Sequence, residues 1–125
     1  MTKQDNNRAL YLQVADQIGD EILRYTYTDG QRIPSVRETA ARYEVNVNTV
    51  IRAYDYLSNA KVIINRRGVG YFVAERARVA VRMLRYKEMD EEGTLDWIFE
   101  RLALLNVPEE RLLNLYTSYL KKRKK

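Results

Sequence analysis

Residues 35–57 read SVRETAARYEVNVNTVIRAYDYL, and this stretch decides the fold. Ser35 and Glu38 have the S-x-x-E spacing of a capping box, in which the hydroxyl and the carboxylate each bond an unpaired backbone amide at the start of a helix. We therefore expect a short helix that begins at this box and ends at about Tyr43. Its inward face would lie at helical spacing, on Val36, Ala40 and Tyr43.

A second short helix follows within the same stretch. Asn46 belongs to the residue types that are favoured at helix N-caps, so we expect the helix to begin there. Its buried side would carry Val50, Ala53, Tyr54 and Leu57, and its outer side Asn48, Thr49, Arg52 and Tyr56. Two short helices joined by a tight turn predict a helix-turn-helix.

The segment before this stretch predicts a longer helix and a connector. Between Ala9 and Tyr25, apolar residues recur every four positions, as in a helix with one buried side. The stripe consists of Leu10, Val14, Ile18 and Ile22, broadened by Tyr11, Ala15 and Tyr25. Asp29-Gly30 is a turn signal and Pro34 follows closely, so residues 27–34 are expected to form the connector.

The segment after the stretch predicts a β-hairpin with a basic tip. Val62–Asn65 and Tyr71–Ala74 are rich in β-branched and aromatic residues, as strands are. Residues 66–70 read RRGVG and supply two glycines for a tight reversal between the strands.

Beyond Glu75 the helical spacing returns and continues to the end of the chain. One stripe contains Val79, Met83 and Tyr86, and a second contains Leu95, Ile98, Leu102 and Leu105. Asn106 is expected to end a helix in the left-handed conformation, and Pro108 to open the last one. Three short helices after a complete hairpin module cannot bury these stripes well, so we expect a second copy of the chain to cover them. A small ligand pocket in this region is the alternative.

The composition excludes most familiar catalytic machinery. The 125 residues correspond to roughly one domain, or a small domain with an appendage, and they include no Cys and no His. Thiolate nucleophiles, Cys/His zinc sites and disulfides are therefore absent, and we expect no enzyme, no metal and no cofactor. No apolar run has the length of a membrane span or of a signal-peptide core, so we expect no membrane association and a cytoplasmic protein.

The positive charge is concentrated in particular segments. The chain has a net charge of +5, and the segment 24–70 alone has eight bases and four acids. Residues 121–125 add five further bases, which leaves the rest of the chain net acidic. The helix-turn-helix, the hairpin tip and the tail are thus the places where a polyanion would bind.

These blocks together resemble a known family. Residues 30–40, 45–54, Leu57 and 66–73 resemble, in order and spacing, the DNA-binding domain of GntR-like bacterial transcription regulators, over about residues 10–74. The asparagine-rich start of the third helix and the short C-terminal extension resemble the YtrA-like branch. The resemblance implies a winged helix whose third helix enters the major groove, a hairpin wing on the backbone or minor groove, and a homodimer.

The fold class expected is therefore mainly α with a small β-hairpin. We expect a winged helix-turn-helix DNA-binding domain at residues 1–75 and a helical dimerisation region with a basic tail at 76–125.

The candidate DNA-binding residues come from the resemblance and from side-chain chemistry. The resemblance implies that Arg37 contacts DNA. It also matches Asn46, Asn48 and Thr49 to the polar residues at the start of the family's recognition helix, and it matches Arg67 and Gly68 to the wing tip. Exposed Asn and Thr side chains at a helix N-terminus can also bond base edges or phosphates, and nearby arginines add affinity for phosphate. The full set is Arg37, Asn46, Asn48, Thr49, Arg52, Arg66, Arg67 and Gly68.

Two positions depart from the family pattern. Val47 stands where many relatives have an arginine that reads bases, so the resemblance does not supply an operator sequence. Lys61 stands where a glycine usually follows the recognition helix, which predicts a changed entry into the hairpin and a cation available to a phosphate.

The function expected is that of a sequence-specific transcriptional repressor. It would bind a pseudo-palindromic operator in double-stranded DNA as a homodimer, with one recognition helix per half-site. A winged-helix module that binds RNA or another protein remains the alternative. The sequence leaves the operator, the regulated genes and any small-molecule effector open.

Overall fold

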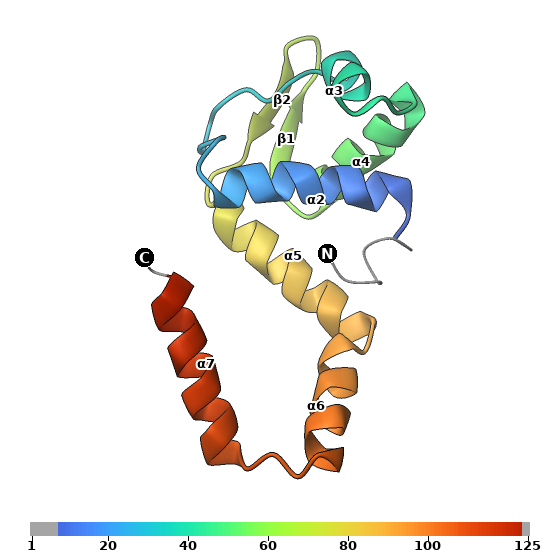
Figure 1. The fold of residues 1–125 in the computed structure, drawn as a ribbon. Coiled ribbons are helices and arrows are strands. Elements are labelled where there is room, and N and C mark those ends of the chain that lie inside the picture. The colour runs from blue at the N-terminus through green and yellow to red at the C-terminus, as the bar shows by residue number, and fades with distance from the viewer. Residues whose placement is uncertain (1–7, 124–125) are drawn as a thin grey trace. The chain divides into compact units, whose positions relative to one another are not determined.

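The computed structural model describes residues 8–123 and is mainly helical, with one antiparallel hairpin, as expected from the sequence (Figure 1). In chain order the elements are α2 (Leu10–Leu23), α3 (Val36–Tyr43), α4 (Val47–Asn59), β1 (Ile63–Arg66), β2 (Gly70–Val73), α5 (Ala77–Glu91), α6 (Thr94–Leu104) and α7 (Glu109–Arg123). The described residues up to Arg85 form one compact unit and those from Tyr86 form a second, so α5 contributes to both. No helix within residues 8–123 is both long and apolar enough to cross a membrane.

The core of the first unit lies where α2, α3, α4 and the hairpin meet. From α2 it takes Val14, Ala15, Ile18 and Ile22, and from α4 it takes Val50, Ala53, Tyr54 and Leu57, all of which are at most 3% exposed. These are the stripes that the helical spacing predicts. The hairpin adds Ile63 and Val73, which face each other across the ladder.

The two ends of the predicted first-helix stripe are wrong. Leu10 begins α2 but is half exposed, and Tyr25 lies beyond the helix end. The helix stops at Leu23 because Tyr25 adopts a left-handed conformation, with φ of 66°. Its amide then bonds the carbonyl of Ile22, and the amide of Thr26 bonds that of Glu21.

Each strand of the hairpin lies one residue nearer the turn than predicted, at Ile63–Arg66 and Gly70–Val73. Arg66 pairs with Gly70, and the ladder runs to Ile63 opposite Val73. Part of the predicted connector also joins it: the amide of Ile33 bonds the carbonyl of Tyr71 at 2.9 Å, and the amide of Val73 bonds the carbonyl of Gln31 at 2.8 Å. Residues 31–33 thus cover the outer edge of β2, which anchors the base of the hairpin.

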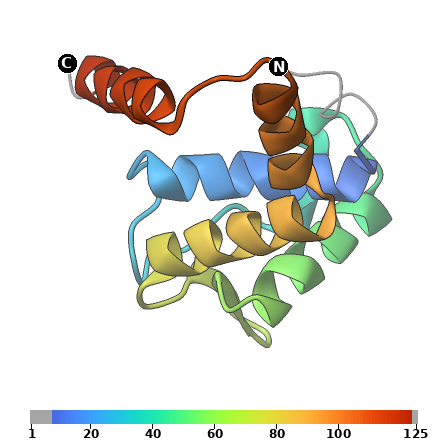
Figure 2. The ribbon, with the colours of Figure 1, turned by 90° about the horizontal axis from the view of Figure 1, so that it is seen from below.

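The first part of α5 lies beside α2 (Figure 2). A guanidinium nitrogen of Arg85 lies 2.7 Å from a carboxylate oxygen of Asp20 and donates to the carbonyl of Asp16 at 3.0 Å. Gly19 permits this approach, because a Cβ there would lie 2.9 Å from the same guanidinium. In α5 the side chains of Ala77 and Val81 are buried. The stripe seen in the sequence, Val79, Met83 and Tyr86, is instead between 50% and 68% exposed.

The second unit contains two helices with large exposed apolar side chains. Asn106 ends the α6 segment with φ of 55°, and Pro108 precedes α7, as the sequence predicts. Neither α6 nor α7 contains a buried residue. Leu95, Ile98 and Leu102 are partly buried, whereas Leu105 is 74% exposed.

Candidate nucleic-acid interface

The capping box at the start of α3 forms as the sequence predicts. The amide of Glu38 donates to the hydroxyl of Ser35, and the amide of Ser35 donates to the carboxylate of Glu38, both at 3.1 Å. The hydrogen bonds from Ser35 and the nearby charge of Arg32 lower the pKa of Glu38. The box fixes the entry of α3 and places Arg37 on its first turn.

A buried hydroxyl network fixes α3 against α4. The hydroxyl of Tyr54, which is fully buried, donates to the carbonyl of Pro34 at 2.7 Å. Since its single proton is used there, the hydroxyl of Thr39, also 2.7 Å away, must donate to the Tyr54 oxygen. Burial raises the pKa of Tyr54 to about 12. The network ties α4, α3 and the segment before α3 to one another.

The turn between the helices points the N-terminus of α4 outward. Glu44 ends α3 in a left-handed conformation, and the side-chain oxygen of Asn46 accepts from the amide of Asn48 at 2.7 Å. The predicted N-cap is therefore confirmed. Asn46 and Asn48 are exposed and Thr49 is half buried, so amide and hydroxyl groups surround the exposed helix end.

Arg52 lies one turn further along α4, on the same side as Asn48. Its guanidinium carbon stacks 4.0 Å from the centre of the Tyr11 ring. The Tyr11 ring also packs against the ring of Tyr56 in an edge-to-face arrangement, with centroids 6.0 Å apart and nearly perpendicular planes. Tyr11 thus positions Arg52. Sequence reasoning missed this role, because 41 positions separate the two residues and the spacing of Tyr11 matches a core stripe equally well.

The hairpin tip carries the other predicted basic group. Arg66 stacks 4.7 Å from the centre of the Phe72 ring, while Arg67 and Gly68 are exposed at the turn. Gly68 has φ of 74° and open space around it. Gly70 has φ of 144°, and a Cβ there would lie 2.9 Å from the guanidinium of Arg32. Arg32 is exposed and adds a cation beside the hairpin that neither the sequence pattern nor the family resemblance singles out.

The predicted site residues fall into separate groups within the first unit. Asn46, Asn48, Thr49 and Arg52 share the first half of α4, Arg37 stands on α3, and Arg66, Arg67 and Gly68 form the hairpin tip. Among the described residues Arg37 has no ion-pair or hydrogen-bonding partner, so its guanidinium is available to a ligand. Arg42, also on α3, instead donates to the hydroxyl of Tyr27 at 3.4 Å.

Lys61, which departs from the family's glycine, takes the conformation that glycine adopts without cost. Its φ is 63°, and its amide bonds the carbonyl of Ser58. The chain then enters β1 through a bond from the amide of Val62 to the carbonyl of Leu57. The lysine thus reverses the chain in the left-handed region and leaves its cation exposed.

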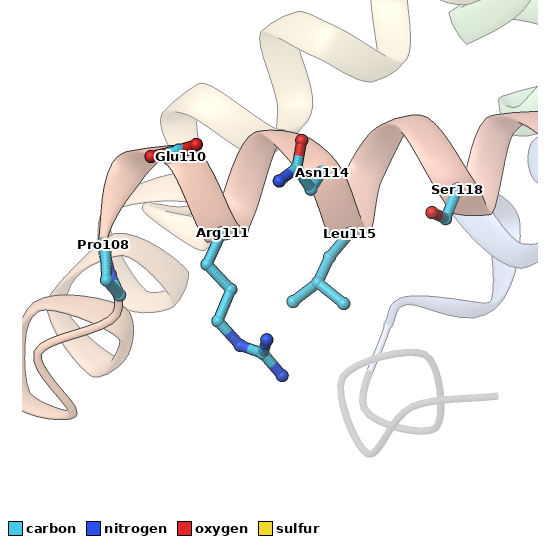
Figure 3. A pocket seen from close by; sticks show the side chains of 6 residues that line it. All are labelled: Pro108, Glu110, Arg111, Asn114, Leu115 and Ser118. Carbon is cyan, nitrogen blue, oxygen red and sulfur yellow. The ribbon is translucent and has the colours of Figure 1, made fainter.

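A hollow of about 290 Å³ lies along α7 in the second unit (Figure 3). It is lined by Pro108, Glu110, Arg111, Asn114, Leu115 and Ser118. Five of the six lie on α7 and Pro108 comes directly before Glu109, so the hollow is a groove on one face of this helix. Within residues 8–123, no cluster of acidic side chains has the composition of a metal site.

The geometry above matches a known family of proteins. The model for the gntR family of bacterial regulatory proteins matches residues 10–73, which span the helix-turn-helix and the hairpin. The chain belongs to the GntR family. It is therefore a transcriptional regulator with a winged-helix DNA-binding domain, and the resemblance inferred from its sequence is confirmed.

Several GntR regulators are similar to this chain over most of their length. The uncharacterized HTH-type transcriptional regulator YhcF of Bacillus subtilis is 32% identical, over 86% of this chain and 87% of the relative. The HTH-type transcriptional repressor YtrA of the same organism is 31% identical, over 70% of this chain and 69% of the relative. These GntR relatives are named as regulators of transcription.

Solved structures of GntR proteins share the fold. A putative GntR regulator from Bacteroides thetaiotaomicron has 39% identity and a TM-score of 0.74, covering 92% of this chain and 99% of that chain. The DNA-binding domain of AraR in complex with operator ORR3 has 28% identity and a TM-score of 0.51, covering 52% of this chain and 78% of that chain.

Proposed function

We propose that this GntR regulator is a repressor that binds a pseudo-palindromic operator as a homodimer. One observation carries the proposal: the exposed head of α4 presents Asn48 and Arg52 beside a capped helix N-terminus, with no acid in residues 47–53. The positive end of the helix dipole favours an anionic partner, and side-chain amides bond base edges in the major groove. The protein would act in the cytoplasm, where a bacterial operator is accessible.

Each group of site residues then has a distinct role. Asn48 and Thr49 would contact base edges, and Asn46 and Arg52 would bind base edges or phosphates nearby. Arg37 would bind a phosphate, because the first helix of this motif crosses the DNA backbone. Arg66, Arg67 and Gly68 would place the hairpin tip against the backbone or in the minor groove.

Residues 76–125 would form the dimerisation region. On α6 and α7 the exposed apolar side chains include Trp97, Phe99, Leu113 and Tyr116, each more than half exposed. A second copy of the chain would remove this surface from water. The sign of regulation follows the relative YtrA, which is named a repressor. Residues 1–75 would supply the DNA-binding domain.

The decisive experiment is selection of bound duplexes from a random pool. We expect one enriched sequence with two-fold symmetry, whose half-site spacing matches a dimer. A gel-shift comparison of that duplex with RNA of the same sequence tests the alternative class of partner. Equal binding to both, or no enriched duplex, would reject a sequence-specific operator.

A further inference from the structure

Two apolar side chains are exposed at the head of α4. Val47 and Ile51 are each 40% exposed, whereas Val50 between them is fully buried. They are four positions apart on one helix, so their side chains are neighbours on one face. Among the described residues, neither belongs to the hydrophobic core cluster or to the partly buried side chains packed against it.

The surroundings of this pair restrict what can cover it. Asn48 follows Val47 and Arg52 follows Ile51, so a polar and basic strip borders the apolar one. The positive N-terminal end of the α4 dipole lies at one end of the pair, and the first acid along the helix is Asp55. The matching surface must therefore be anionic, must accept hydrogen bonds and must also offer small apolar groups. In the major groove of duplex DNA, the thymine 5-methyl is such a group.

We propose that Val47 and Ile51 bind the 5-methyl groups of thymines, so that each half-site carries T·A pairs at the positions facing them. The inference rests on the proposed binding of duplex DNA by α4 and specifies which bases it selects. Asn48 and Arg52 supply directional hydrogen bonds, and the apolar pair adds selectivity at adjacent positions. Removing a methyl and its matching side chain from water favours binding by about fourfold per methyl group.

The first measurement uses the full chain and the duplex recovered by selection. Each thymine of one half-site, and of its symmetric counterpart, is replaced in turn by deoxyuridine, which keeps the base pair and lacks only the 5-methyl. We expect at least one position at which the replacement weakens binding by about fourfold per half-site. Since the protein is unaltered, this result does not depend on the folding of any variant.

The second measurement assigns the effect to residues. Val47→Ala and Ile51→Ala should each weaken binding to the thymine duplex, and each should abolish the deoxyuridine effect at one matched position. Leu10→Ala is the control, because it truncates a half-exposed apolar side chain on α2, outside both α4 and the proposed dimerisation region. It should leave the deoxyuridine pattern unchanged.

The possible outcomes distinguish a failure of the thymine-methyl contact from a failure of the proposed operator binding. If an operator is selected but no thymine is sensitive to deoxyuridine, the methyl contact is absent. If the sensitivity persists undiminished in both alanine variants, other residues make the contact. A change in sedimentation of the free variants, with DNA binding intact, would instead make this face a contact between copies of the chain. Failure to select any duplex would reject the proposed function itself.

Discussion

The side chains at the head of α4 differ in how freely they move before DNA binds. Arg52 stacks on the Tyr11 ring, so it would lose little conformational freedom on binding a phosphate as proposed. The amide of Asn48 is exposed, and the hairpin-tip cation of Arg67 stands on a short turn. In the proposed complex Asn48 contacts a base and Arg67 contacts the backbone. Loss of a base contact weakens binding to one sequence, whereas loss of a backbone contact weakens binding to every sequence.

This difference gives the first prediction. Asn48→Ala should lose about 1 to 3 kcal/mol of binding free energy on the selected duplex and little on unrelated DNA. Arg67→Ala should weaken both more nearly equally and reduce the slope of log affinity against log salt by about one per contact. Binding titrations on selected and scrambled duplexes at two salt concentrations measure both effects. If Asn48→Ala scales both affinities by the same factor, Asn48 does not read a base.

The buried hydroxyl of Tyr54 gives the second prediction. Tyr54→Phe leaves the carbonyl of Pro34 and the hydroxyl of Thr39 without their partner. The free energy of unfolding should fall by about 1 to 3 kcal/mol at neutral pH, measured by urea denaturation. Tyr86→Phe, the same change at an exposed ring, is the control and should have little effect.

The same residue makes stability depend on alkaline pH. Burial raises the pKa of Tyr54 to about 12 in the folded protein, against about 10 for an unfolded chain. Below about pH 10 both states keep the proton, so the contribution is fully present; above it the unfolded state deprotonates first. Between about pH 10 and pH 12 the native protein should lose about 2 to 3 kcal/mol through this group. An equal decline in Tyr54→Phe would contradict this.

At the scale of elements, the helix ends show what the sequence could predict. The capping box of Ser35 and Glu38 and the cap by Asn46 depend on neighbouring residues, and both form as expected. The strand pairing of residues 31–33 with β2 joins segments far apart in the chain, and no local pattern predicts it. On α5, Val79 and Val81 both fit helical stripes. The packing of α5 against the core buries Val81 and leaves Val79 half exposed, and that packing joins segments far apart in the chain.

The junction between α4 and β1 gives the third prediction. Lys61 holds φ of 63°, which costs a residue with a Cβ about 1 kcal/mol or more. Lys61→Gly should therefore stabilise the fold by up to about 1 kcal/mol, after the added flexibility of the unfolded chain is deducted. Urea denaturation measures the change. Lys61→Ala removes the cation and retains the Cβ, so it should not stabilise; a gain there would make the lysine charge the cause.

At the scale of the molecule, the second unit was the least predictable part. Its helix boundaries follow from Asn106 and Pro108, which act locally. The apolar stripe of its first helix does not show which surface packs against it. Leu95, Ile98 and Leu102 at helical spacing fit an internal core and a contact with a second copy equally well. The described residues of α6 and α7 include no buried side chain, which favours the second copy.

This gives the fourth prediction. The full chain should sediment as a dimer, whereas a fragment ending at Arg85, which keeps Val81 and the Arg85 to Asp20 ion pair, should sediment as a folded monomer. Paired substitution of Ile98 and Leu102 by Asp in the full chain should also abolish the dimer. Circular dichroism confirms that each protein is folded. Two dimers would place the dimer contacts outside residues 86–125, and two monomers would reject the proposed homodimer.

The orientation of the Asn46 amide has a genetic consequence. Its oxygen accepts from the amide of Asn48, and its NH₂ would be the donor that faces DNA in the proposed complex. Asn46→Asp retains an equally good cap for α4 and replaces that donor with a negative charge. The subunit should fold and pair normally yet be repelled by phosphates. Expressed equally with the natural chain, it would leave about one quarter of the dimers intact under random pairing. The allele should thus be dominant in a reporter strain; full repression there would show that the Asn46 position does not face DNA.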